Sequence, residues 1–288
     1  MSPFPFLFGV IVFAWGISMF LNVKLARKTS PALATFLFQL LGLPLLGLVL
    51  FAHSVPSVSF MTIIESLLLG FLIGVALILS MAALRDEKSV LVYSILESSL
   101  VMVFFFQVGV GIQTFSLSAL LSILVVFTGV SLCSLTGGNR ERFYSFRISR
   151  GMLFALLSAV LTALYYILLE GEVRSVGWLY PVLYIRIGAM MTAFVYFITN
   201  EKVYMRRLRN APWRIGFGAA TADVLGFSAF SVLLLSQHAW YVQLISTIST
   251  IIAVVMGALF FKERVTTYRI VGVTSIFAGI VLLHLVSW

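Results

Sequence analysis

Three charged residues stand inside long apolar runs of this chain, and their types suit the recognition of a small polar molecule. They are Glu97, Arg186 and Asp223. A charged side chain at the centre of a membrane helix costs roughly 2.5–3.5 kcal/mol, so such a residue is expected to face a partner, water or a ligand. Charges of both signs in an otherwise apolar chain therefore predict a polar path through a bilayer.

Glu97 and Asp223 are predicted to bind a proton or a positively charged group. Glu97 lies about 12 Å into its apolar run, with Tyr93 one turn earlier. A buried carboxyl group can exchange a proton or hold an amine. Glycines and alanines surround Asp223, which leaves room for a ligand or for a close helix crossing. The plain alternative is that each carboxylate belongs to a structural pair.

Arg186 follows Pro181 in its apolar run, and three roles are open to it. It could clamp a carboxylate or phosphate in a bidentate fork. It could instead neutralise Glu97 or Asp223, or reach the membrane surface along its aliphatic stem. We favour a structural role.

Aromatic and polar side chains are expected to complete the site. Trp15, Tyr165 and Tyr166 could stack on a substrate or hold an ammonium group by cation–π contact, although ordinary packing explains them equally well. Gln243 and Thr247 belong to a polar stripe, QLISTIST, with helical spacing. Hydroxyl groups of this kind also join membrane helices. The predicted substrate-binding residues are Glu97, Asp223, Arg186, Trp15, Tyr93, Tyr165, Tyr166, Gln243 and Thr247.

The composition places the chain among integral membrane proteins. Of its 288 residues, 61% are hydrophobic and only 10% are charged, whereas soluble domains carry about 25% charged residues. The net charge of +9 comes from short connections between apolar runs, so we exclude nucleic acid as a partner. One cysteine and three separated histidines predict neither a metal site nor a disulfide, and no cofactor motif is present.

The apolar runs predict an all-α integral membrane fold with ten transmembrane helices, because each run is about 20 residues long. The predicted spans cover residues 4–24, 31–51, 60–84, 89–111, 115–135, 150–169, 179–199, 213–236, 239–261 and 266–287.

A polar connection at 139–150 divides the chain into two five-helix units, 1–138 and 151–288. An offset of 150 aligns Pro31 with Pro181 and Gly129 with Gly279. Since each unit has an odd number of helices, the two units must be inserted with opposite orientations. The sequence therefore predicts two inverted five-helix repeats, an arrangement typical of secondary transporters.

The basic residues predict the orientation. All but two of the 19 lysines and arginines lie in the odd-numbered connections. The positive-inside rule then places these connections in the cytoplasm and both termini outside, in a multi-pass protein of the cell (cytoplasmic) membrane. The lipid bilayer is thus an expected partner, and the chain is expected to act as a monomer or a homodimer.

The stretch from Ala239 to Leu285 resembles the closing helices of the drug/metabolite transporter superfamily, in its EamA-like branch. The resemblance rests on an acidic residue at a helix end followed by spaced glycines, here Glu263, Gly272 and Gly279. The first half keeps a worn copy of this pattern, with Gln113 in place of the acid. The resemblance implies ten helices in two halves and the transport of small metabolites, amino acids, drugs or sugar phosphates.

Together these observations predict a secondary active transporter of a small polar or amine-bearing metabolite, such as an amino acid. It would work by alternating access, coupled to protons or by exchange. The alternatives are a transporter of quaternary-amine or drug cations and a lipid-headgroup flippase. An enzyme is not expected, because the sequence contains no motif for a nucleophile–base pair, a catalytic metal or a phosphate-binding loop.

Overall fold

The computed structural model describes residues 4–52, 58–112, 114–134, 149–200, 204–261 and 267–286. Every element within these ranges is a helix. In the first half they are α1 (Phe4–Lys28), α2 (Pro31–Ala52), α3 (Phe60–Asp86), α4 (Ser89–Glu97), α5 (Ser99–Gly109) and α6 (Leu117–Ser134). In the second half they are α7 (Arg150–Val176), α8 (Leu179–Asn200), α9 (Tyr204–Arg209), α10 (Trp213–Leu234), α11 (Ala239–Ser246), α12 (Ile248–Phe261) and α13 (Thr267–Val286).

The all-helical, membrane-type fold agrees with the sequence. Seven of the described helices are long and apolar enough to cross a membrane, with α4 and α5 counted as one span. The predicted spans at 115–135, 239–261 and 266–287 fall on shorter described apolar helices, so the total of ten stays a prediction. Gln113, Glu263 and most of the 139–150 connection lie outside the described residues.

Two predicted spans are each divided by a single turn residue, which corrects the sequence interpretation. The span 89–111 turns at Ser98, and the span 239–261 turns at Thr247. Their backbone angles, −61° and −18° for Ser98 and −58° and −22° for Thr247, are those of a tighter 3₁₀ turn. In each case the hydroxyl group donates to a preceding carbonyl, Ile95 for Ser98 and Gln243 for Thr247. The sequence analysis missed these turns because the polar residues around them, Glu97 and Thr247 among them, were interpreted as parts of a binding site.

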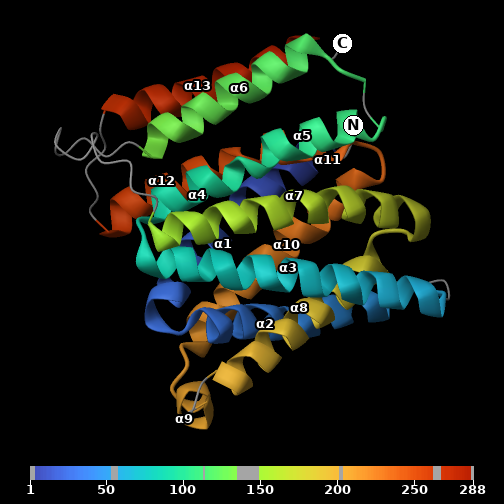
Figure 1. The fold of residues 1–288 in the computed structure, drawn as a ribbon, viewed down its shortest axis with the longest axis vertical. Helices are drawn as coiled ribbons and strands as arrows, with labels where there is room; N and C mark the ends of the chain where they lie inside the picture. The colour runs from blue at the N-terminus through green and yellow to red at the C-terminus, as the bar shows by residue number, and fades with distance from the viewer. Residues whose placement is uncertain are drawn as a thin grey trace.

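Close backbone contacts hold the helices together. In Figure 1 the helices run alongside one another, with α6 and α13 together at one edge and α2 and α8 at the opposite edge. Gly70 of α3 faces Gly188 of α8, and a Cβ atom on either residue would overlap the opposite backbone. Gly129 and Gly279 have the same role between α6 and α13. Small residues permit such close approach. In a bilayer the hydrophobic effect does not drive helices together, so this close packing stabilises their association.

The two ends of the bundle differ in charge. Both termini lie at one end, and α9 lies at the other (Figure 1). The helix ends and connections at the α9 end carry Lys28, Arg85, Lys88, Arg150, Arg206, Arg207, Arg209 and Arg214. We call it the basic end. The short helix α9 is a second correction, because its charged sequence had been expected to form only a connection.

Candidate functional site

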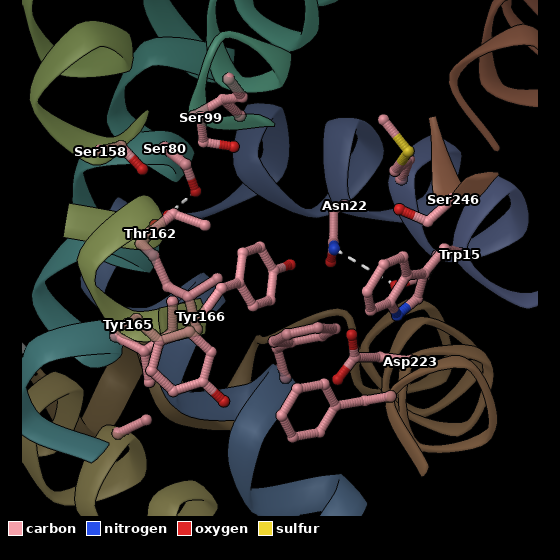
Figure 2. Close-up of a pocket in the computed structure, with 18 of the residues that line it drawn as sticks. Trp15, Asn22, Ser80, Ser99, Ser158, Thr162, Tyr165, Tyr166, Asp223 and Ser246 are labelled. Atoms are coloured by element: carbon pink, nitrogen blue, oxygen red, sulfur yellow. Dashed lines mark hydrogen bonds between the residues drawn. The ribbon is translucent and has the colours of Figure 1, made fainter. Parts of the chain in front are cut away.

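A cavity of about 230 Å³ lies in the middle of the bundle. Its lining extends toward the basic end, since it includes Met81 and Leu84 from the last two turns of α3. Figure 2 shows Trp15 and Asp223 facing Tyr165 and Tyr166 across this space. The predicted residues that line it are Trp15, Tyr93, Glu97, Tyr165, Tyr166, Arg186, Asp223 and Gln243.

Glu97 is held by two threonine hydroxyl groups. It is the last residue of α4, directly before the turn at Ser98. Thr250 donates to its Oε1 at 2.8 Å, and Thr247 donates to its Oε2 at 3.2 Å. Thr247 therefore lies directly behind the cavity wall. Among the described residues, no ion pair joins Glu97 to a cation.

Arg186 pairs with Asp223, and this answers the question that the sequence left open. The guanidinium Nη1 lies 2.9 Å from Asp223 Oδ2. Its other donors reach α2, with Nε 3.1 Å from the carbonyl oxygen of Gln39 and Nη2 2.8 Å from that of Phe38. The Arg186 side chain is only 4% exposed, whereas that of Asp223 is 20% exposed. Arg186 thus joins α2, α8 and α10, and its three groups of donors are engaged.

The sequence of α2 prepares this contact. Pro44 lies inside α2 and has no N–H group for the helical ladder. Gly42 leaves the space that the guanidinium occupies, because a Cβ atom there would overlap it. The carbonyl group that Pro44 leaves without its helical donor is that of Leu40, so the space at Gly42 is what lets the guanidinium reach the carbonyl groups of Phe38 and Gln39.

An aromatic layer closes the cavity on the side of the termini. Phe230, about one turn before the end of α10, lies 5.2 Å from Trp15 and 5.1 Å from Tyr166 between ring centroids. Tyr165 contacts Tyr166 at 5.5 Å. On the opposite side, the Tyr93 hydroxyl group donates to the carbonyl oxygen of Met19 at 2.7 Å. Aromatic faces thus surround much of the cavity.

Two amide oxygens in the cavity wall have no hydrogen-bond partner among the described residues: Asn22 Oδ1 and Gln243 Oε1. The amide nitrogen of Gln243 donates to Ser99 Oγ at 2.6 Å, which fixes the orientation of the side chain. Asn22 is a residue that the sequence analysis missed. Its spacing of two helical turns from Trp15 could have revealed it.

A second polar cluster, also missed, lies at the end with the termini. Glu170 is 5% exposed and accepts hydrogen bonds from Gln107, from His238 at 2.9 Å and from the Ala239 amide at 2.9 Å. Arg174 forms an ion pair with it at 2.9 Å. The cluster connects α5, α7 and the α10–α11 connection at that end of the bundle.

The described residues offer no group of three His, Cys, Asp or Glu side chains that could hold a metal ion. Long apolar helices, packed around a cavity with a few charged side chains in its wall, define this chain as a multi-pass α-helical membrane protein. Residues 149–285 match the model of the EamA-like transporter family, consistent with the drug/metabolite transporter superfamily. The second half of the chain is thus similar to a family of membrane transporters.

A crystal structure of another protein is similar in fold to this chain. The TM-score is 0.75, with 97% of this chain and 96% of the other covered. Since the two sequences share only 12% identity, the likeness shows the fold alone. A comparison with curated protein sequences finds no significant match.

Proposed function

We propose that this transporter moves a small amine-bearing metabolite, such as an amino acid or a related compound, and that Glu97 anchors the amine. The observation that carries this proposal is that the cavity wall holds one carboxylate without a cationic partner among the described residues and two amide oxygens without a hydrogen-bond partner there. They are the Glu97 carboxylate, Asn22 Oδ1 and Gln243 Oε1. An ammonium group has three donors and no acceptor, so it suits this set. Trp15, Tyr165 and Tyr166 add ring faces for cation–π contact.

The guanidinium of Arg186 already donates to three protein oxygens, which favours a substrate bound through its amine over one bound through its carboxylate. A substrate carboxylate would have to displace Asp223 or two backbone carbonyls from the guanidinium. The size of the cavity supports a metabolite over a drug-like cation, because about 230 Å³ is below the roughly 300–1,000 Å³ of drug-sized sites.

Glu97 is also suited to exchange a proton with the substrate. A threonine hydroxyl group can donate to a carboxylate or accept from a carboxylic acid. Thr247 and Thr250 can therefore satisfy Glu97 in both protonation states. Binding of the amine and of the proton would then compete for one carboxyl group, which is the basis of coupled antiport.

Alternating access is proposed to rest on two inverted units, 1–138 and 151–288. Support comes from segments related by the offset of 150. Both α6 and α13 begin at related positions, 117 and 267, and pack on each other. The turns at Ser98 and Thr247 occupy nearly related positions, and Glu97 contacts the residue 150 positions later. Two related units that meet at the site could rock about it.

The test is a thermal-shift screen of purified protein against amino acids, quaternary amines, nucleotide sugars and sugar phosphates. A ligand that binds only the folded state stabilises it by mass action. We expect amines or amino acids to stabilise the wild-type protein, and Glu97→Gln to abolish both the shift and transport in proteoliposomes. Glu65→Gln is the matched control, because Glu65 is exposed and outside the cavity lining.

A response to phosphorylated compounds alone would refute the amine proposal, as would an unchanged response in Glu97→Gln. Stabilisation of the protein by quaternary amines but not by amino acids would favour a cation transporter. Monodisperse elution of both variants would show that any loss reflects the site and not misfolding.

A further inference from the structure

A second hollow, of about 500 Å³, lies at the basic end of the bundle and is separate from the central cavity. Three segments meet there. The end of α1 and the turn into α2 contribute Lys28 and Ser30, the end of α3 contributes Arg85, and α9 contributes Arg206 and Arg207 (Figure 1). Neighbouring Asn210 and Ala211 complete this side of the lining. The hollow therefore joins residues from both halves of the chain.

The charge of the hollow is strongly one-sided. Four of its lining residues are lysine or arginine, and none is acidic. Arg85 has an acidic neighbour in Asp86, at 3.2 Å, and both side chains are substantially exposed. Among the described residues, no ion pair joins Lys28 or Arg206 to an acid. An anion would thus meet several cations in one concave site.

Membrane topology alone does not explain this convergence. The positive-inside rule requires basic residues in these connections, but it does not require them to line one hollow. Arg209 and Arg214 satisfy the same rule and do not line it. Arg206 and Arg209 even belong to the same short helix.

Uncharged groups suit a phosphate with an apolar attachment. Asn210 offers an exposed amide, and the Ser30 hydroxyl group accepts from the Leu33 amide at 3.3 Å while keeping its own proton to donate. Leu33, which is buried, and Ala211 provide apolar contacts beside the charges. The hollow lies where α1 and α3 end and α2 begins, the level at which lipid head groups are found. Near that end, α8 also exposes Tyr196 and Ile198 to the hydrocarbon.

We propose that this hollow binds the phosphodiester head group of an anionic phospholipid from the leaflet at the basic end. Arginine and lysine donate charge-assisted hydrogen bonds to phosphate oxygens, while the acyl chains remain in the bilayer. Because the head group contacts the α1–α2 turn, α3 and α9 at once, it connects the first half of the chain to the second at this end.

The proposal is tested by native mass spectrometry of the full chain with phosphatidylglycerol or phosphatidylcholine. The test variant is Lys28→Gln/Arg206→Gln, and the matched control is Arg209→Gln/Arg214→Gln, which removes the same net charge from the same end. Wild-type protein should retain phosphatidylglycerol in preference to phosphatidylcholine. The test variant should bind it about thirty-fold more weakly, and the control should stay within about three-fold.

An equal loss in the control would overturn the proposal, because it would indicate a diffuse basic surface. Equal retention of the two lipids would overturn it as well. Displacement of phosphatidylglycerol by glycerol phosphate at similar concentration would identify a site for soluble phosphate instead. If the double variant does not elute as a folded protein, the single pair Arg206→Gln and Arg209→Gln gives the same comparison.

Discussion

The ion pair of Arg186 and Asp223 makes a quantitative prediction about stability. Replacing Arg186 by Met removes the donors to Asp223 Oδ2 and to two carbonyl oxygens of α2. A buried charge that loses its partner typically destabilises a protein by about 3–5 kcal/mol. Asp223, the charge left without its partner, is only 20% exposed, so we expect Arg186→Met to lower the free energy of unfolding by about that amount.

The partner substitution should be milder. Asp223→Asn keeps an oxygen that can accept from Arg186, and the guanidinium retains both carbonyl groups. We therefore expect a loss of about 1.5–3 kcal/mol, the range for hydrogen bonds to charged groups. In Arg186→Met/Asp223→Asn neither charge is left alone, so the double variant should lose less than the sum of the single variants.

The assay is equilibrium unfolding of the purified protein in mixed micelles with increasing denaturing detergent, followed by tryptophan fluorescence. The double-mutant cycle gives the coupling energy directly. Glu97→Gln serves as a second cycle with Arg186→Met, because no ion pair or hydrogen bond joins these two residues. Additivity of Arg186→Met and Asp223→Asn within about 0.5 kcal/mol would refute the reasoning.

Three further outcomes follow from the same structure. Gly42→Ala should displace the Arg186 guanidinium and destabilise the protein, whereas Gly47→Ala in the same helix, with open space beside it, should not; equal melting temperatures would contradict this. Gln243→Leu removes an acceptor from the cavity and should weaken amine binding about five- to ten-fold by calorimetry; an unchanged affinity would exclude that contact. A cysteine at Asn210, in a Cys133→Ala background, should react with an impermeant maleimide only from the cytoplasm, and labelling from outside would reverse the proposed orientation.

Much of the site was predictable from the free-energy cost of placing a charged side chain in a membrane helix. An apolar membrane helix retains Glu97, Arg186 or Asp223 only with a reason, and the structure places all three in the wall of one cavity. Which partner Arg186 takes was not predictable, because it depends on the carbonyl groups of α2 beside Gly42 and Pro44.

In the fold, too, the positions of the helices could be predicted from the sequence pattern, whereas turns and long-range side-chain contacts could not. Apolar length was enough to locate the helices. The turns at Ser98 and Thr247 fall in polar stretches, but the same residue types also line a binding site or join helices, so their presence did not indicate a turn. Glu170 stands just beyond the predicted apolar span 150–169, and nothing nearby in sequence suggests that Gln107 and His238 converge on it.

The pairing of α6 with α13 has a consequence for how this protein can change over generations. No described residue of either helix lines the central cavity. Their contact is made through Gly129 and Gly279, where backbone meets backbone and little variation is tolerated. The contact between α6 and α13 thus lies apart from the proposed substrate site. If the cavity binds the substrate as proposed, replacements on the other helices would change the substrate while the contact between α6 and α13 stays the same.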